Sequence, residues 1–212
     1  LVSRLPIPNQ ETERQRPDEA AQHYLVLSLI ELREANLEAC AESAKKALSL
    51  AESTNSPTLR GEALLILGTA SLERGNGDEV RRYAKAALHQ SQRTGSLQGM
   101  GAGLYSLARA ALVRKELREA EALAKESESC MRRAGSLGGI AFALSLAGVV
   151  KHDQELWAEA AKYYAEAYEI FSRLGQHVHC AINLFNAAQV NACCGDLASA
   201  IAQASRAVAL VG

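Results

Sequence analysis

Residues 132–148 of the chain read RRAGSLGGIAFALSLAG, which places a turn between two helices. The two arginines suit the last turn of a helix, because cations interact favourably with the negative end of the helix dipole. Gly135 tolerates the left-handed conformation that closes many helices. Three more turn residues stand in the same register at steps of forty residues, at Asn55, Gly95 and Gly175. The sequence therefore predicts a repeated helical unit of forty residues.

The same period continues inside the units, at register positions that are apolar or small. Four such positions hold Tyr24, Leu64, Leu104, Leu144 and Leu184; Cys40, Val80, Ala120, Ala160 and Ala200; Ala44, Ala84, Ala124, Tyr164 and Ala204; and Ala47, Ala87, Ser127, Ala167 and Ala207. Small residues at spacings of three and four lie on one helix face and let two helices approach closely. Neither helix of a unit can bury its apolar face alone, so stacked units must share one core.

Each unit also breaks near its middle. Residues 75–78 (GNGD) and 195–196 (GD) predict a turn followed by a helix start, at which the aspartate accepts a backbone N–H bond. Residues 115–116 (KE) and 154–155 (QE) mark the corresponding break less strongly in the third and fourth units. Each unit is thus expected to be a helix of about 16 residues, a short turn and a second helix of similar length.

The first helix of each unit carries a signature pair that ends in a small residue: Leu27-Ser28, Leu67-Gly68, Leu107-Ala108, Ala147-Gly148 and Ala187-Ala188. This pattern resembles the tetratricopeptide repeat (TPR), in a forty-residue form rather than the usual ~34. The resemblance implies an all-α, right-handed superhelical solenoid of five helix-turn-helix repeats with about ten helices. The expected repeat domain is 17–212, divided into 17–56, 57–96, 97–136, 137–176 and 177–212. Segments such as 133–141 and 195–200 are similar to C-terminal arrays of large bacterial signal-transduction ATPases and transcription regulators.

In this family the first helices line a concave groove, which gives a set of candidate partner-binding residues. They are Leu65, Thr69, Tyr105, Arg109, Phe142, Ser145, Val149, Phe185 and Gln189, with Leu25 and Leu29 at the same positions in the first unit. The strip is mostly apolar with Arg109 as its central cation, which suits an amphipathic helix or an extended apolar peptide. The alternative is that some of these residues belong to the core between repeats, because helical spacing alone cannot separate groove from core.

The second helix of the fourth unit contains half of the ten aromatic residues of the chain: Trp157, Tyr163, Tyr164, Tyr168 and Phe171. One interpretation is a core that locally replaces alanine with aromatic side chains. The other is an outward aromatic patch for a partner or a dimer contact.

Composition argues against several other functions. The formal net charge of −1 lacks the basic excess that nucleic-acid binding requires. No run reaches the ~18 apolar residues of a membrane span. Five cysteines without paired spacing indicate a reducing, cytoplasmic location.

His177 and His179 point in different directions on a helix, so we expect no metal site, and the glycines of 99–103 lack the context of a phosphate loop. With no nucleophile–base pair visible, we expect neither a cofactor nor an enzyme.

The two ends of the chain carry expectations of their own. Residues 1–16 contain two prolines, which disfavour a regular helix, and form either a linker or a peptide that lies in the groove through Leu1, Val2, Leu5 and Ile7. Because the chain begins with Leu1, we expect it to be part of a longer protein. Residues 209–212 lack a polar cap, so either more repeats follow or this end self-associates.

The leading hypothesis is therefore a scaffold that binds a protein or peptide as the sensing arm of a bacterial regulator. The first alternative is a self-assembly module, such as a homodimer through the terminal repeat. A small-ligand site in the groove is a further alternative.

Overall fold

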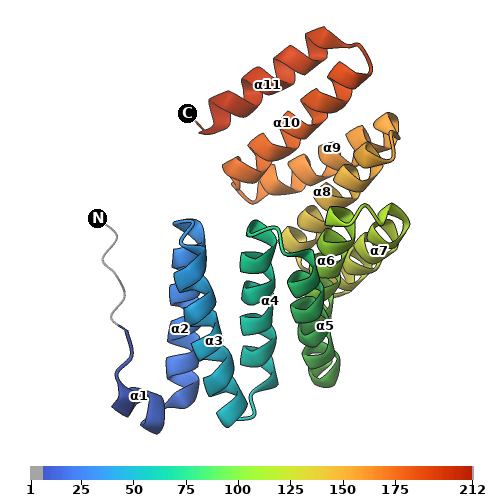
Figure 1. Ribbon diagram of the computed structural model, residues 1–212. Coiled ribbons are helices and arrows are strands. Elements are labelled where there is room, and N and C mark those ends of the chain that lie inside the picture. Colours follow the sequence, from blue (N-terminus) through green and yellow to red (C-terminus); the bar gives the residue numbers. More distant parts are fainter. Residues whose placement is uncertain (1–6, 212) are drawn as a thin grey trace. The chain divides into compact units, whose positions relative to one another are not determined.

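The computed structural model describes residues 7–211, which form helices joined by short turns (Figure 1). The helices are α1 (Gln10–Gln15), α2 (Pro17–Arg33), α3 (Leu37–Ser53), α4 (Pro57–Glu73), α5 (Gly77–Thr94), α6 (Leu97–Val113), α7 (Leu117–Arg133), α8 (Leu137–Asp153), α9 (Trp157–Arg173), α10 (His177–Cys193) and α11 (Leu197–Val211). No strand occurs within this part of the chain, and the predicted all-α fold of consecutive helix pairs is confirmed. None of the helices in residues 7–211 is long and apolar enough to cross a membrane.

The underlying step of the array is twenty residues, half of the sequence period, because α2 to α11 begin at regular twenty-residue intervals. Every turn between them closes on a residue with positive φ: Ala35, Asn55, Gly75, Gly95, Lys115, Gly135, Glu155, Gly175 and Gly195. The next residue donates its backbone N–H to a carbonyl five residues back, as from Ser56 to Ala51 at 2.9 Å. This is the Schellman closure of a helix. The turns expected from Asn55 and the glycines are confirmed, and the weaker mid-unit breaks have the same geometry.

The helix starts agree with the predicted caps in one case and differ in another. Asp196 accepts a hydrogen bond from the backbone N–H of Ser199 at 3.1 Å, as expected. In the second repeat, however, the cap is Asn76, whose Oδ1 accepts from the N–H of Glu79 at 3.2 Å. The prediction that Asp78 caps this helix is wrong, because Asp78 already lies inside α5, one residue beyond its first residue.

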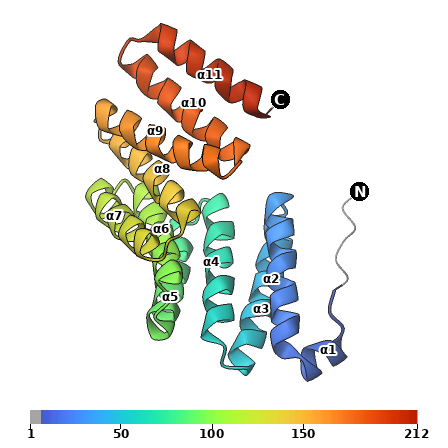
Figure 2. The ribbon, with the colours of Figure 1, turned by 180° about the vertical axis from the view of Figure 1, so that it is seen from behind.

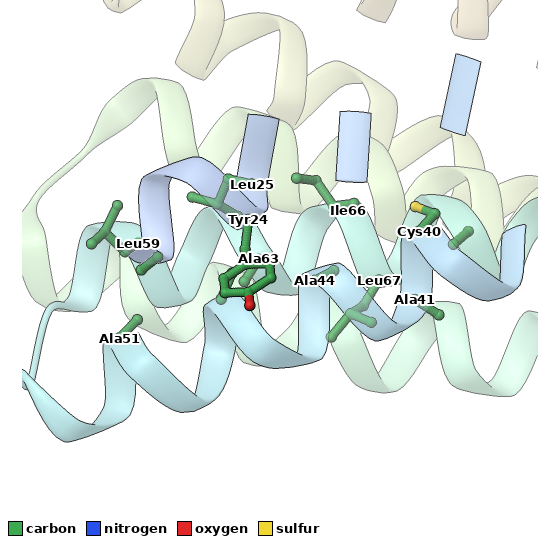
Figure 3. Packing of buried hydrophobic residues seen from close by; sticks show 13 residues of the cluster. Tyr24, Leu25, Cys40, Ala41, Ala44, Ala51, Leu59, Ala63, Ile66 and Leu67 are labelled. Atoms are coloured by element: carbon green, nitrogen blue, oxygen red, sulfur yellow. The ribbon is translucent and has the colours of Figure 1, made fainter. Parts of the chain in front are cut away.

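The chain divides into two compact units, Leu1–Ala110 and Ala111–Gly212. In the first unit, α2 and α3 run side by side in opposite directions, and α4 packs against both α3 and α5 (Figure 1). Its core is built from alanines around a few larger side chains. Figure 3 shows Tyr24 beside the alanines of α3 and α4, among them the fully buried Ala44 and Ala63. The small register positions predicted from the sequence thus form the helix contacts of this unit.

The second unit uses the same helix pairs, α8 with α9 and α10 with α11, seen from behind in Figure 2. Its core contains two buried aromatic side chains of α9, Tyr164 and Phe171. Trp157, Tyr163 and Tyr168 are only half-buried. The aromatic cluster of the fourth repeat is therefore core for two members, while three keep part of their surface accessible.

The expectation that residues 1–16 lack a regular helix is wrong for α1. Both prolines precede the helix, and Asn9 caps it by accepting from the N–H of Thr12 at 2.8 Å. Glu13 of α1 accepts a hydrogen bond from the Tyr24 hydroxyl at 2.7 Å, which attaches α1 to the first repeat. Ile7 is 70% exposed. The remaining apolar residues of the suggested groove peptide, Leu1, Val2 and Leu5, lie outside the described residues.

Candidate functional site

The first unit has a hollow between α4, α6 and the C-terminal end of α5. Its volume is about 360 Å³. The lining residues are Pro57, Thr58, Gly61, Glu62, Leu65, Ser91, Thr94, Ser96, Gln98, Gly99 and Ala102. The hollow exists because Gly61, Gly99 and Ala102 have almost no side chain, while hydroxyl and amide groups supply polar edges. Leu65 is the one predicted groove residue in this lining.

A shallow depression with no room for a water molecule lies further along α4 and α6. It is lined by Gly68, Thr69, Leu72, Val80, Ser106 and Arg109, so two further predicted residues share it. We call the surface formed by Leu65, Thr69, Tyr105 and Arg109 the α4–α6 strip. All four side chains are half-buried, which leaves each of them partly accessible.

The charge in the α4–α6 strip is already partly compensated. The Arg109 guanidinium lies 3.6 Å from a Glu73 carboxylate oxygen and 5.8 Å from the centre of the Tyr105 ring. Burial raises the pKa of Tyr105, while the nearby Arg109 opposes that rise. The Thr69 hydroxyl donates to the Leu65 carbonyl at 3.0 Å within α4. A partner carboxylate at this strip would therefore compete with Glu73 for Arg109.

The predicted groove residues of the second unit differ in accessibility. Phe142 packs edge-on against Phe171 and His179, with ring centroids 5.1 and 4.8 Å apart, so its ring joins the aromatic core. Ser145 and Val149 are half-buried. Phe185 is 54% exposed on α10. Gln189 is exposed one turn further along the same helix.

In the first repeat, one of the two predicted groove positions is buried and the other is exposed. Leu25 is 5% exposed, whereas Leu29, one turn later, is 48% exposed. Leu25 thus belongs to the core between repeats, which is the alternative that spacing could not decide. The first repeat retains only Leu29 as an accessible member of the series.

Sequence reasoning missed the polar edge of the first hollow and a buried amide in the second unit. Glu62 and Gln98 line the hollow but stand outside the register positions taken from the family. Asn183 is 1% exposed at a position that holds His23, Ala63, Gly103 and Ala143 in earlier repeats. The signal that could have identified it is an amide at a position that holds a small residue in three of the four earlier repeats. In the described part of the chain, no group of three or more His, Cys, Asp or Glu side chains could hold a metal ion.

Comparisons with known proteins agree with this geometry. Residues 139–211 match a family model described as tetratricopeptide repeat. A search of curated protein sequences finds no significant match.

Solved structures with similar folds cover almost the whole chain. The crystal structure of BtubC (BKLC) from P. vanneervenii is 18% identical, with a TM-score of 0.76 over 95% of this chain and 84% of its own. A Rap protein complexed with Competence and Sporulation Factor is 16% identical, with a TM-score of 0.83 over 94% of this chain and 56% of its own.

A signal-transduction ATPase with a tetratricopeptide repeat sensor, from Pyrococcus horikoshii, is also 16% identical. Its TM-score is 0.73 over 91% of this chain and 29% of its own, so this chain spans less than a third of that protein. The family match and these shared folds agree with the repeated helix pairs seen from α2 to α11. Residues 139–211 therefore carry tetratricopeptide repeats, and the helix pairs that precede them have the same tetratricopeptide-repeat fold.

Proposed function

We propose that this chain is a scaffold that binds a protein or peptide and acts as the sensing arm of a larger bacterial transcription regulator. The observation that carries the proposal is the α4–α6 strip, where Leu65 lines a hollow of about 360 Å³ and Thr69 and Arg109 border a shallow depression further along the same helices. Apolar walls with polar edges suit the side chains of an amphipathic helix or an extended apolar segment. Arg109 favours a ligand that carries an acidic residue among its apolar ones.

Two of the similar structures support this choice of class. One is a Rap protein solved with the Competence and Sporulation Factor, and another is an ATPase whose repeats are described as a sensor. Their low identity relates them to this chain by fold, so the ligand must be found from the strip itself. The sensing role further requires that ligand binding be transmitted to a neighbouring domain.

A peptide-display selection on the purified chain tests the proposal. We expect enrichment of apolar peptides with one acidic residue, whose affinity falls at least tenfold in an Arg109→Gln variant because a charge-assisted hydrogen bond is lost. Lys85→Gln, at an exposed site on α5 of the same unit, is the matched control and should bind normally. Selected peptides that bind both variants like the wild type would remove the α4–α6 strip from the proposal.

Self-assembly is a second candidate, favoured by the outward face of α11. Leu197, Ile201, Val208 and Val211 are 64, 68, 69 and 58% exposed along this one helix. A second copy of the chain could cover this stripe. Light scattering over a range of concentrations tests this alternative. We expect the wild type to be a dimer, and we expect a double variant with Ile201→Lys and Val208→Lys to be a monomer. A wild type that stays monomeric at every concentration excludes this alternative.

A further inference from the structure

The turn between α4 and α5 contains the pair Asn76-Gly77, and Asn76 is the one asparagine of the chain that a glycine follows. Asn76 is exposed, and Gly77 is the first residue of α5. The backbone nitrogen of the residue after an asparagine can attack the amide carbon, Cγ, of the asparagine side chain. A glycine hinders this attack least, because it has no Cβ. The turn thus combines an accessible amide with the least hindered neighbour.

The start of α5 holds the Asn76 side chain in place. Its Oδ1 accepts a hydrogen bond from the backbone N–H of Glu79 at 3.2 Å, as the N-cap of the helix. When Cγ is attacked, negative charge develops on Oδ1, and an N–H donor that already points at this oxygen stabilises that charge. The positive end of the α5 dipole acts in the same direction. The nitrogen of Gly77 lies outside the helical hydrogen-bond ladder, because the first N–H groups of a helix have no partner within it.

We propose that Asn76-Gly77 is a site of spontaneous deamidation. A bond forms between the Gly77 nitrogen and Asn76 Cγ and closes a succinimide ring. The bond from Cγ to Nδ2 breaks, and Nδ2 leaves as ammonia with the proton of the Gly77 N–H. Water then opens the ring at one of its two carbonyl carbons. Opening at Cγ gives aspartate, whereas opening at the backbone carbonyl carbon gives isoaspartate, in which the main chain runs through the side chain. Water is the sole co-reactant.

The two products differ in their effect on α5. Aspartate keeps the backbone and is as good an N-cap as asparagine. The fifth repeat has an aspartate at the equivalent position, where Asp196 accepts from the N–H of Ser199 at 3.1 Å. Isoaspartate instead adds a carbon atom to the main chain. The Asn76 N–H donates to the Ser71 carbonyl at 2.9 Å, and the Asn76 carbonyl accepts from the Val80 N–H at 3.1 Å, so the added atom disturbs the end of α4 and the start of α5 together.

Asn36 provides an internal comparison, because it occupies the same position one repeat earlier and is also exposed. Its Oδ1 accepts from the backbone N–H of Ala39 at 3.4 Å. Its φ and ψ are −84° and 75°, against −92° and 81° at Asn76. The residue that follows Asn36 is Leu37, whose Cβ hinders the attacking nitrogen. The two asparagines share their cap and their backbone conformation, so a difference in their reaction rates reports on the following residue.

The test incubates the folded chain for several weeks at mildly alkaline pH, followed by digestion with trypsin and mass spectrometry. Peptide 75–81 contains Asn76 as its one side-chain amide, and peptide 34–45 likewise contains only Asn36. A sample digested without incubation corrects for reaction during the digestion. We expect Asn76 to deamidate about ten times faster than Asn36 or more, and Gly77→Ala to remove most of this difference. Gly77 lies inside α5, where alanine favours the helix, so this variant should keep the circular dichroism of the wild type.

Equal rates at Asn76 and Asn36, or an unchanged rate at Asn76 in the Gly77→Ala variant, would overturn the proposal, because the cap would then protect the amide whatever residue follows.

Thermal unfolding tests the consequence for α5. Both products carry one more negative charge than the starting chain, so ion exchange separates them from it. Asn76→Asp should melt at the temperature of the wild type, since aspartate caps the helix equally well. The fraction that contains isoaspartate should melt a few degrees lower. If that fraction melts together with Asn76→Asp, the disturbance of α5 by isoaspartate is wrong.

Discussion

The second and fourth repeats build the same helix pair from different side chains. In the second repeat, the first helix carries Gly68 and the second helix carries Ala84, and a Cβ added at Gly68 would meet Tyr83 Cβ at an ordinary 3.7 Å. In the fourth repeat, the equivalent residues are Gly148 and Tyr164. A Cβ added at Gly148 would come within 2.6 Å of the Tyr164 ring. The same glycine position is therefore roomy where the second helix carries Ala84 and tightly filled where it carries Tyr164.

A second series of facing positions lies at the joints between repeats. Within each unit, a residue near the end of one repeat meets a residue near the start of the next. The facing pairs are Ala51 with Leu59, Ser91 with Gly99, Met131 with Gly139, and Phe171 with His179. In two of these pairs a large side chain faces a small one, whereas Ser91 and Gly99 are both small, and Phe171 and His179 are both large and stack with ring centroids 4.9 Å apart. Repeats with the same backbone geometry therefore differ in which of the two facing helices carries the larger side chain.

The largest effect should come from a charge placed in the shared alanine face. Ala160 is fully buried on α9, beside Tyr164 in one cluster. Ala160→Glu should destabilise the chain by about 3–5 kcal/mol, because it buries an unpaired carboxylate where only a methyl group fits. Chemical denaturation measures the change. Ala158→Glu, at an exposed site in the first turn of the same helix, is the control and should be nearly neutral. A mild effect of Ala160→Glu would mean that the repeats do not share one register.

The pair of glycines tests whether Tyr164 is what fills the space at Gly148. Gly148→Ala should cost about 1–3 kcal/mol, because the new methyl group overlaps the Tyr164 ring. Gly68→Ala should be neutral or gain up to about 1 kcal/mol, because alanine favours the helix and the site has room. Both variants are measured by urea denaturation. Equal effects of the two substitutions would show that the aromatic side chain is not what requires Gly148.

The two repeats also differ at a polar position of the first helix. Ser71 donates to Glu79 at 2.9 Å in the second repeat. The equivalent Lys151 is 7% exposed and lies 3.0 Å from Glu159. Lys151 also lies 3.1 Å from Glu121 of the preceding helix, so it joins neighbouring repeats as Ser71 does not.

Hydrogen bonds from Lys125, Gln154 and Lys151 lower the pKa of Glu121 to about 2. A carboxylate with a depressed pKa stabilises the fold above its ordinary pKa and loses that contribution as the pH falls towards the folded value. Glu121→Gln should therefore cost about 1–2 kcal/mol near neutral pH, a figure reduced for partial exposure. The difference from wild type should shrink as the pH falls from about 5 towards 2.

Denaturation curves at several pH values measure this trend, with the exposed Glu126→Gln on the same helix as control. A difference that stays constant over this range would show that the ion pairs of Glu121 contribute nothing.

The fold could be read from the sequence because the forty-residue spacing is fixed by backbone geometry. Gly95, Gly135 and Gly175 all adopt the left-handed conformation that the turns require. The twenty-residue step was harder to see in the sequence, because Ala35, Lys115 and Glu155 adopt the left-handed conformation although they are neither glycine nor asparagine. There the tertiary packing of two helices overrides local preference.

The residues of the candidate site could be predicted less well than the fold, because residues at the same register position can be buried in one repeat and exposed in another. Leu25 is buried, whereas Leu65, forty residues later, lines an open hollow. The difference lies in the small volume of the surrounding residues, Gly61 on the same helix and Gly99 and Ala102 on α6. Helical spacing describes one helix at a time and cannot report such voids.

The smallest effect concerns the turns in which the two repeats differ. The mid-unit turn of the second repeat closes on Gly75, with φ of 75°, whereas that of the fourth closes on Glu155, with φ of 61°. A left-handed conformation costs roughly 1–2 kcal/mol for a residue with a Cβ and little for glycine, whose greater freedom in the unfolded chain offsets part of the gain. Glu155→Gly should therefore stabilise the chain by about 0.5–1 kcal/mol, visible as a higher Tm. Gly75→Ala should lower the Tm by a similar amount, because it introduces the same strain into the second repeat. If Glu155→Gly destabilised the chain instead, the glutamate side chain would have to stabilise the α8–α9 turn by more than the backbone strain costs.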